Sequence, residues 1–353
     1  MLSWSTVVSL RMERLFLSTP SAEEEYDALF EDLSPVPTAG WVEPGSPPAL
    51  PGHVNFDDGA YNALRRQTRA IRKGRFGSRV AYVTAEDWEL FACLYQKPLL
   101  QPTVRQNELL DLLDREGPLN IGLMKEITGL LVKEITPVLH RLQEAFLVYE
   151  DQTDGDGDRG WYSMRQEFPD LDLGRYTKEE TLGKLLPRLA HRMVFLTAEM
   201  AAEFYAQPIR MVRTALDQLA QEQILIPVQA GGQTGYLLPE DAKSCAGALC
   251  QPQRGVIALQ RNDPLVRCLG KKEKATLSQG DEALYYLLID GEIQGAVCGR
   301  FKFGPHVLEN VSLTIPPEQA KERKDEIIDA VYTVFDRAAS PLARYCGEPT
   351  GYR

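Results

Sequence analysis

The sequence predicts a mainly helical α+β protein in which two copies of a three-helix-and-hairpin unit precede a small β-rich domain. Three observations predict it. Three amphipathic segments followed by two short apolar runs occur at about 104–164, and the same series returns at about 176–239. Residues that cap helices or form turns separate the segments. After residue 253 the pattern changes to apolar runs of strand length.

Composition sets limits on the function. The chain has 353 residues, 44% of them hydrophobic, which is enough for two or three packed domains. Its net charge of −11 argues against a basic surface that coats nucleic acid everywhere, but a local basic patch remains possible because charges more than about 10 Å apart are screened. No apolar run reaches the roughly 18 residues of a membrane helix, and the N-terminus lacks the features of a signal peptide. We expect a cytoplasmic protein that does not bind membranes.

Metal and cofactor sites are not indicated. The six cysteines form no CxxC pair, and none has a histidine at metal-ligand spacing, so free thiols are expected. Asp154, Asp156 and Asp158 follow the spacing of a calcium loop, but Arg159 and Arg165 replace its glycine and its final glutamate. A polar hairpin turn is the expected structure there. The sequence also lacks the Walker loop and GxGxxG motifs that bind phosphate groups, and the HExxH and GxSxG motifs of hydrolases. We therefore expect no cofactor.

Residues 1–100 are expected to form an N-terminal helical region. Two helices are predicted within 1–34, and a loop follows at 34–52, where six prolines exclude a helix or an inner strand. The basic segment 62–79 comes next. Arginines at helical spacing predict a helix that ends at Gly74, followed by a flexible basic loop.

Residues 101–170 and 171–245 are each expected to form a winged helix-turn-helix domain. In the first, Asn120 and Gly129 bound the second helix, and Pro137 lies at the start of the third or kinks it. In the second, Thr177 and Glu180 form a capping box. In such a unit the third helix can enter a major groove while the hairpin lies beside the backbone. Residues 253–345 are expected to form a small α+β domain with a tight turn at Asp290-Gly291.

The basic segment is a candidate phosphate-binding site. It holds seven cations and no acid: Arg65, Arg66, Arg69, Arg72, Lys73, Arg75 and Arg79. The planar guanidinium group bonds two phosphate oxygens at once, and about half or more of protein–DNA hydrogen bonds go to phosphate or sugar. The alternative is a solvated face that pairs with acidic helices such as "SAEEEYDALFED".

The two presumed recognition helices supply further candidates. The first carries Lys133, His140 and Arg141 against Glu134 and Glu144, and the second carries Arg210 and Arg213 against Asp217. Two interpretations are open: the cations contact DNA, or they belong to ordinary solvated helix faces. The first hairpin turn argues against DNA contact, because its five acidic residues would repel phosphate.

Two later stretches carry a resemblance to a known family. Tandem winged helices followed by "LQRNDPLVRCLGKKEKATL" and "YYLLIDGEIQGAVCGRFK" resemble the AlkZ/YcaQ family of bacterial DNA glycosylases. The motif Asp263-Pro264-Leu265, the hairpin at 290–295 and the opening "LSWSTVVSLRMERLFL" are similar to the family pattern. The resemblance implies a channel for damaged or crosslinked duplex DNA, and hydrolysis of a base–sugar bond without a cofactor.

One departure concerns the catalytic signature. The family has Gln-x-Gln or Gln-x-Asp just after its first helices, where it positions the attacking water, but this chain has "SPVPTAGWVEPGSPP" there. Glu43 is the only carboxylate of that loop, and is either a catalytic base or an ordinary loop residue. Trp41 is a candidate for stacking on a base.

The sequence therefore predicts a protein that binds double-stranded DNA, damaged DNA included, through winged helices. DNA glycosylase activity is one alternative. The other is a non-catalytic DNA-binding protein or a transcriptional regulator. The oligomeric state is left open.

Overall fold

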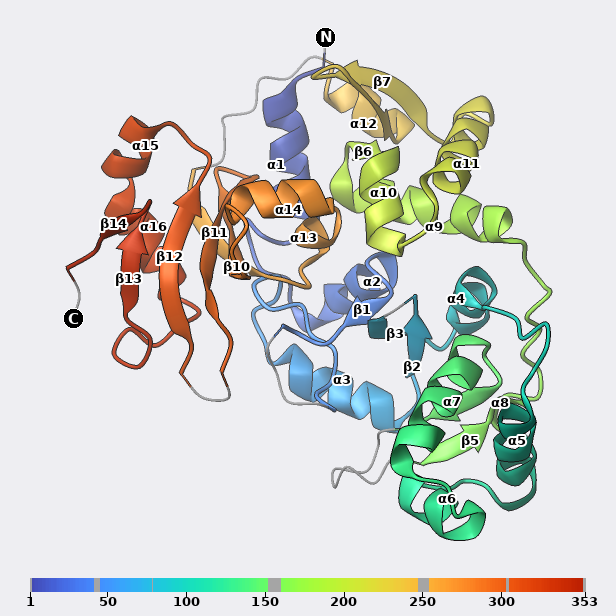
Figure 1. Cartoon of the computed structure of the whole chain (residues 1–353). Helices are drawn as coiled ribbons and strands as arrows, with labels where there is room; N and C mark the ends of the chain where they lie inside the picture. Colours follow the sequence, from blue (N-terminus) through green and yellow to red (C-terminus); the bar gives the residue numbers. More distant parts are fainter. Residues whose placement is uncertain are drawn as a thin grey trace.

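The computed structural model describes residues 2–40, 45–77, 79–151, 160–246, 254–302 and 305–351 (Figure 1). Within these residues the chain is a mixture of helices and strands, as the sequence predicts. Four features of the sequence lie outside the described residues: Trp41, Glu43, the aspartates of the turn 152–159, and Cys250.

The N-terminal part combines helices with a small sheet. The helices are α1 (Trp4–Arg14), α2 (Glu23–Asp32), α3 (Asp58–Gln67) and α4 (Trp88–Tyr95). The strands β1 (Val36–Pro37), β2 (Ile71–Phe76) and β3 (Arg79–Thr84) form an antiparallel sheet in the order β1-β3-β2. The sequence predicted helices, a proline-rich loop and a basic segment in this region, and it did not predict the sheet.

The secondary structure predicted for the basic segment 62–79 was partly wrong, because strands replace the end of the expected helix. The expected helix ends early, at Gln67, and the chain reverses at Arg69, whose φ is +60°. Of the residues expected to form a flexible loop, Gly74, Arg75, Phe76 and Arg79 belong to the strands β2 and β3. Gly74, expected to end a helix, lies inside β2, where a Cβ atom would come within 2.5 Å of the Phe76 ring. The glycine makes room for that ring, and the arginine spacing alone could not reveal this.

The first repeat has its own apolar core. Its elements are α5 (Val104–Glu116), α6 (Ile121–Thr128), α7 (Val132–Glu144), β4 (Val148–Glu150), β5 (Trp161–Ser163) and α8 (Met164–Glu167). The capping predictions are confirmed: the Asn120 side chain accepts from the N–H of Leu123, and Gly129 adopts a left-handed conformation at the end of α6. Pro137 lies inside α7.

The second repeat follows the same order of elements. It contains α9 (Lys178–Met193), β6 (Leu196–Thr197), α10 (Ala198–Tyr205), α11 (Ile209–Gln221), β7 (Ile226–Ala230), β8 (Gln233–Leu237) and α12 (Pro239–Ser244). The capping box of Thr177 and Glu180 is present. β6, which was not expected, pairs with β8 and makes the hairpin a three-stranded sheet in the order β6-β8-β7.

The C-terminal part is a six-stranded sheet in the order β14-β13-β12-β11-β10-β9. Its strands are β9 (Val256–Gln260), β10 (Ala283–Ile289), β11 (Glu292–Arg300), β12 (Val307–Leu313), β13 (Leu342–Tyr345) and β14 (Glu348–Pro349). The short helices α13 (Pro264–Arg267) and α14 (Lys271–Leu277) connect β9 to β10. The Asp290-Gly291 turn has positive φ at both residues, as a tight hairpin requires.

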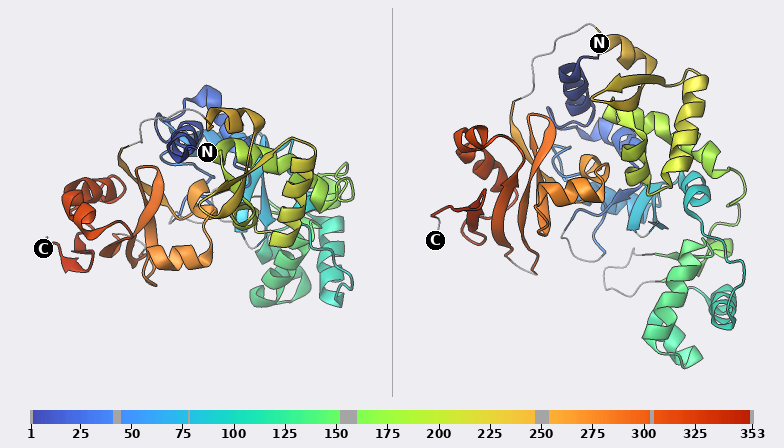
Figure 2. Two further views of the ribbon diagram at one scale, coloured as in Figure 1. Left: turned by 90° about the horizontal axis from the view of Figure 1, so that it is seen from above. Right: turned by 45° about the horizontal axis from the view of Figure 1, so that its top comes forward.

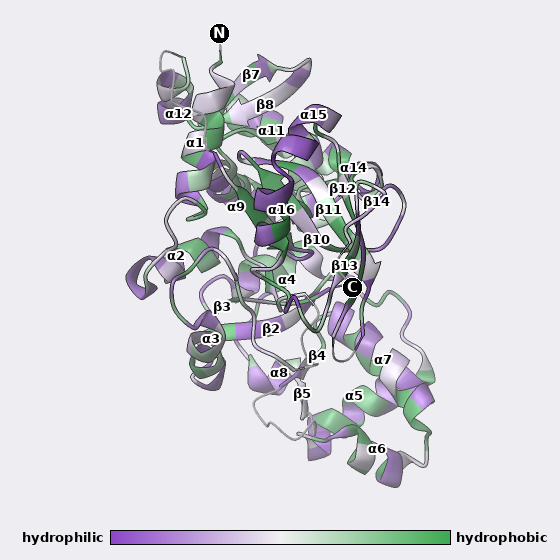
Figure 3. Cartoon of the chain, turned by 90° about the vertical axis from the view of Figure 1, so that its left-hand side faces the viewer, coloured by the Kyte–Doolittle hydropathy of each residue, from purple (hydrophilic) through white to green (hydrophobic). Residues whose placement is uncertain are grey.

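Two helices follow the strand β12. α15 (Pro317–Glu322) and α16 (Lys324–Val331) are separated by Arg323, which forms ion pairs with Asp290 and Glu326. α16 lies over the sheet (Figure 3) and buries Ile327, Ile328 and Val331 against it.

The largest core joins distant parts of the chain. It contains buried residues from α2, α4, α9 and α10 together with Leu259, Leu265 and Leu288 from the C-terminal part. The first repeat projects from this body beside β2, on the side away from the C-terminal sheet (Figures 1 and 2). The region around β1 lies close to both α10 and α13, because Pro35 and Pro37 line a crevice together with Phe204 and Arg267.

Candidate nucleic-acid interface

The segment 260–267 holds the proline-rich loop from one side. Asn262 Nδ2 donates to the Thr38 carbonyl at 2.9 Å, and the Gln260 side chain accepts from the N–H of Gly40. Arg267 Nη1 donates to the Pro35 carbonyl at 2.8 Å. Among the described residues of the loop, the two-residue strand β1 is the only helix or strand, so these side chains supply much of the backbone hydrogen bonding there.

Arg267 is a buried cation at the centre of this contact. Its guanidinium carbon lies 3.8 Å from the centroid of the Phe204 ring, and its Nη2 donates to the Phe204 carbonyl at 3.1 Å. Among the described residues no carboxylate forms an ion pair with it. Burial lowers its pKa to about 10, which still leaves it charged at neutral pH. Carbonyl oxygens of the loop and of α10 therefore solvate this charge.

His53 fixes the other end of the loop. Its Nε2 lies 2.8 Å from Asp263 Oδ2, and its Nδ1 bonds the carbonyl of Leu15. A carbonyl and a carboxylate both accept, so each ring nitrogen must carry a proton, and the ring is an imidazolium. Burial opposes that charge, but the charge and hydrogen bond of Asp263 outweigh it and raise the pKa of His53. The resulting ion pair is sealed from solvent and positions the loop.

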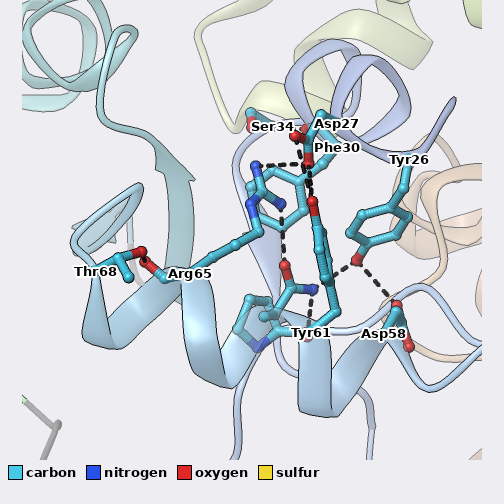
Figure 4. A network of polar contacts seen from close by, with 10 residues as sticks. Tyr26, Asp27, Phe30, Ser34, Asp58, Tyr61, Arg65 and Thr68 are labelled. Atoms are coloured by element: carbon cyan, nitrogen blue, oxygen red, sulfur yellow. Dashed lines mark hydrogen bonds and ion pairs between the residues drawn. The ribbon is translucent and has the colours of Figure 1, made fainter. Parts of the chain in front are cut away.

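A third group of contacts fixes the middle of the loop (Figure 4). Asp58 accepts from the Tyr26 hydroxyl at 2.9 Å and from the N–H of Leu50 at 2.6 Å. Asn62 Nδ2 donates to Tyr26 Oη at 2.6 Å and to the Pro48 carbonyl at 3.0 Å. Burial, and then the charge of Asp58, raise the pKa of Tyr26. The start of α3 is thereby tied to both α2 and the loop.

Most cations of the basic segment bond other groups of the chain. Arg65 pairs with Asp27 at 3.2 Å and lies over the ring of Phe30 (Figure 4). This ion pair agrees with the alternative interpretation of the sequence, in which the basic segment pairs with the acidic helix α2. Arg66 donates to the carbonyl of Gly45 at 2.8 Å, and Arg69 pairs with Glu167.

The strand β2 turns its cations towards the first repeat. Lys73 is only 3% exposed and pairs with the equally buried Glu150 at 2.7 Å. Arg75 Nε donates to Gln143 at 3.1 Å. Arg72 lies over the Phe168 ring, with 4.6 Å between the guanidinium carbon and the ring centroid. These three side chains attach the first repeat to the N-terminal sheet.

Arg79 is different, because its side chain is exposed and forms no ion pair or hydrogen bond with any described residue. It lines a cavity of about 430 Å³ together with Arg261 and Lys274. It also lines a smaller crevice with Pro35, Pro37 and Arg267. The cation therefore lies between the cavity and β1.

The presumed recognition helices present few free cations. On α7, Lys133 is exposed, whereas Arg141 donates to the carbonyls of Lys97 and Pro98. On α11, Arg210 is exposed and Arg213 pairs with Glu199 at 3.0 Å. The start of α7 also exposes apolar side chains, because Leu131 and Val132 are each 49% exposed.

A cavity of about 980 Å³ lies between α10, α14 and the hairpin β10–β11. Its lining mixes the aromatic rings of Trp4 and Phe195 with Lys271, Lys272 and Glu199. No group of His, Cys, Asp or Glu among the residues that the structure describes could hold a metal ion. Across the same residues the helices are too short or too polar to span a membrane. Cys93, Cys245, Cys268, Cys298 and Cys346 are free thiols, as expected.

Sequence reasoning missed His53, Arg261, Arg267 and Lys274. Three of them fall in 259–277, where five cations face two acids. That excess was a usable signal for a second basic cluster, but the stretch contributed only to the family resemblance. His53 carried no signal, because its partner lies 210 residues further along the chain.

The arrangement of these helices and strands is that of a DNA-glycosylase-like fold. The chain is similar to the Streptomyces sahachiroi DNA glycosylase AlkZ, with a TM-score of 0.63 at 14% sequence identity over 97% of this chain and 98% of that one. The expected resemblance to the AlkZ/YcaQ family is confirmed at the level of the fold. No protein-family model and no curated protein sequence matches the chain.

Proposed function

We propose that the chain is a cytoplasmic protein that binds double-stranded DNA through two winged helices, one within 101–170 and one within 171–245. The observation that supports this most strongly is the likeness to a DNA glycosylase along nearly the whole chain. The order of elements supports it as well, because each repeat has three helices and a hairpin. Residues 1–100 and 253–345 would flank the pair, and both contribute to the core that the second repeat shares with them.

In this proposal α7 and α11 are the recognition helices. Lys133 and Arg210 are their exposed cations and would contact phosphate or bases. Arg141 and Arg213 would need to leave their present partners to reach DNA. The same holds for the basic segment, in which Arg79 is the side chain free to bind without such a rearrangement.

Hydrolysis of the N-glycosidic bond of alkylated or crosslinked bases is the enzymatic form of the proposal. Its support is the loop, which is fixed from three sides as a catalytic loop must be. The described part of the loop near β1, residues 34–40, contains neither a carboxylate nor a glutamine. Glu43 would have to activate the water, and Trp41 would stack on a base. A DNA-binding relative without catalysis, or a regulator that recognises a defined sequence, is the alternative.

One experiment separates these forms. The protein is incubated with duplexes that carry N7-alkylguanine or a nitrogen-mustard crosslink, and abasic sites are counted. Release of base by the wild type and its loss in Glu43→Gln would support the enzyme. Tight binding to intact duplex without base release would leave the non-catalytic form. No binding to any duplex would overturn the proposed function.

A further inference from the structure

We propose that Arg79, Arg261 and Lys274 form a pocket for one phosphate of a DNA strand and so fix that strand relative to the β1 loop. This inference rests on the duplex binding proposed above and extends it to a particular site. The three cations come from different segments of the chain: β3, the turn after β9, and α14. All three line the same cavity of about 430 Å³.

The first argument is that like charges are held together. Neither Arg79 nor Lys274 forms an ion pair with a described carboxylate. Burial, and then the charge of Arg79, lower the pKa of the Lys274 amine, and the charge of Glu203 opposes this. The charge of Arg79 also lowers the pKa of the buried Arg267. Cations held this close repel one another, and an anion bound among them removes the repulsion.

The second argument concerns the lining of the cavity. Asn262, Ser278 and Tyr286 add neutral hydrogen-bonding groups beside the cations, which suits the several oxygens of a phosphate. Asp281 and Glu282 also line the cavity and would repel an anion at their end. The carbonyl of Glu282 accepts from the N–H of Gly299 at 3.0 Å, which places these neighbouring acids beside β11. The phosphate therefore belongs at the end formed by the cations.

The third argument is that the pocket is coupled to the loop. A Cβ atom on Gly40 would lie 2.8 Å from Arg261 Cγ, so the stem of this arginine packs directly on the loop backbone. The neighbouring Asn262 bonds Thr38, and Arg79 reaches both the cavity and the crevice beside Pro35 and Pro37. Phosphate contacts set the position of a nucleic acid and carry no sequence information. A phosphate held here presents the adjoining sugar to β1.

The test is a scan of single methylphosphonates, each of which removes the charge of one phosphate in a fluorescent duplex. Binding is measured by anisotropy for the wild type and for the double variant Arg79→Gln/Lys274→Gln. The control Lys243→Gln/Lys321→Gln removes the same charge from two exposed lysines elsewhere. Thermal unfolding checks that both variants fold, and Lys274→Arg keeps the charge.

The expected result is one strand position at which the neutral linkage weakens wild-type binding about tenfold, since that is roughly the value of one charge-assisted hydrogen bond. The double variant binds the unmodified duplex with a similar decrease in affinity, and the neutral linkage at that position weakens it no further. Its slope of log affinity against log salt falls by about one for each cation that no longer binds phosphate, while the control keeps the wild-type slope.

Two other outcomes are distinct. In the first, the wild type binds duplex, and a neutral linkage at any position lowers the affinity of the double variant as much as that of the wild type. The pocket is then excluded and the proposed function stands. If the wild type binds no duplex, the proposed function is overturned and this inference with it.

Discussion

His53 Nε2 lies 2.8 Å from Asp263 Oδ2, although 210 residues separate the two along the chain. Neither side chain reaches solvent, and the second ring nitrogen bonds the Leu15 carbonyl. The pair therefore joins the end of the proline-rich loop to the Asp-Pro-Leu motif and to the end of α1. It is a buried ion pair whose role is to position the loop.

Replacing Asp263 with Asn should lower the free energy of unfolding by about 3–5 kcal/mol, because it leaves an imidazolium buried without its counter-charge. Urea denaturation measures the change. Asp281→Asn is the control, since that carboxylate is exposed and its replacement should cost less than about 0.5 kcal/mol. Equal losses in the two variants would show that the pair does not stabilise the fold.

The pH dependence of stability should reveal the charge on His53. Its pKa in the folded state is raised above the ordinary value of about 6.5, so between the two pKa values the folded protein binds more protons than the unfolded chain. The stabilisation is complete below the unfolded pKa and is lost as pH rises through the folded pKa. The difference in unfolding free energy between wild type and His53→Gln should therefore shrink from about pH 6 upwards. A difference that grows with pH would contradict an imidazolium at this position.

Local signals in the sequence were sufficient for much of the fold. The caps at Asn120, Gly129 and Thr177 act within one helical turn, so the bounds of these helices could be predicted. The hairpin at 71–84 could not be predicted in this way. Its basic residues have helical spacing, but they lie in a strand and contact the first repeat. Lys73, for example, is buried and pairs with Glu150, which lies 77 residues further along the chain.

The candidate site was harder to predict than the fold. The loop 34–52 could be recognised from its prolines, but the side chains that fix it are remote in sequence, and Arg267 shows why. Its partners are backbone carbonyls, and a carbonyl leaves no signature in a sequence. The cavity cations were similarly hidden, because Arg79 and Lys274 meet only in the folded chain.

Arg267→Lys should destabilise the protein by about 2–4 kcal/mol, since a compact ammonium cannot reproduce a planar group that bonds several carbonyls and stacks on Phe204. The shift of the urea midpoint measures this loss. Arg300→Lys provides the matched control, because Arg300 is exposed and pairs with Glu309 on the surface. If both variants unfold at the same urea concentration, the contacts of Arg267 contribute no stability.

The Lys73–Glu150 ion pair should respond differently to one replacement and to two. Lys73→Met alone leaves a buried carboxylate and should cost about 3–5 kcal/mol. The double variant Lys73→Met/Glu150→Leu removes both charges and should recover at least half of that loss, because apolar side chains often replace a buried pair without cost. Chemical denaturation of the three proteins provides the comparison. A double variant less stable than the single one would show that Glu150 stabilises the fold through other contacts.

Gly74 and Gly183 should respond in opposite ways to alanine. At Gly74 the new Cβ atom would lie 2.5 Å from the Phe76 ring, inside a paired strand, and overpacking of this kind costs about 1–3 kcal/mol. Gly183 lies inside α9 with no atom within 4 Å of the Cβ position, so alanine there should stabilise by about 0.5–1 kcal/mol through helix propensity. Thermal unfolding of the two variants measures both effects, and each protein serves as the control for the other. A neutral Gly74→Ala would mean that the Phe76 ring can move aside, so that the close approach of this ring does not require a glycine in the middle of β2.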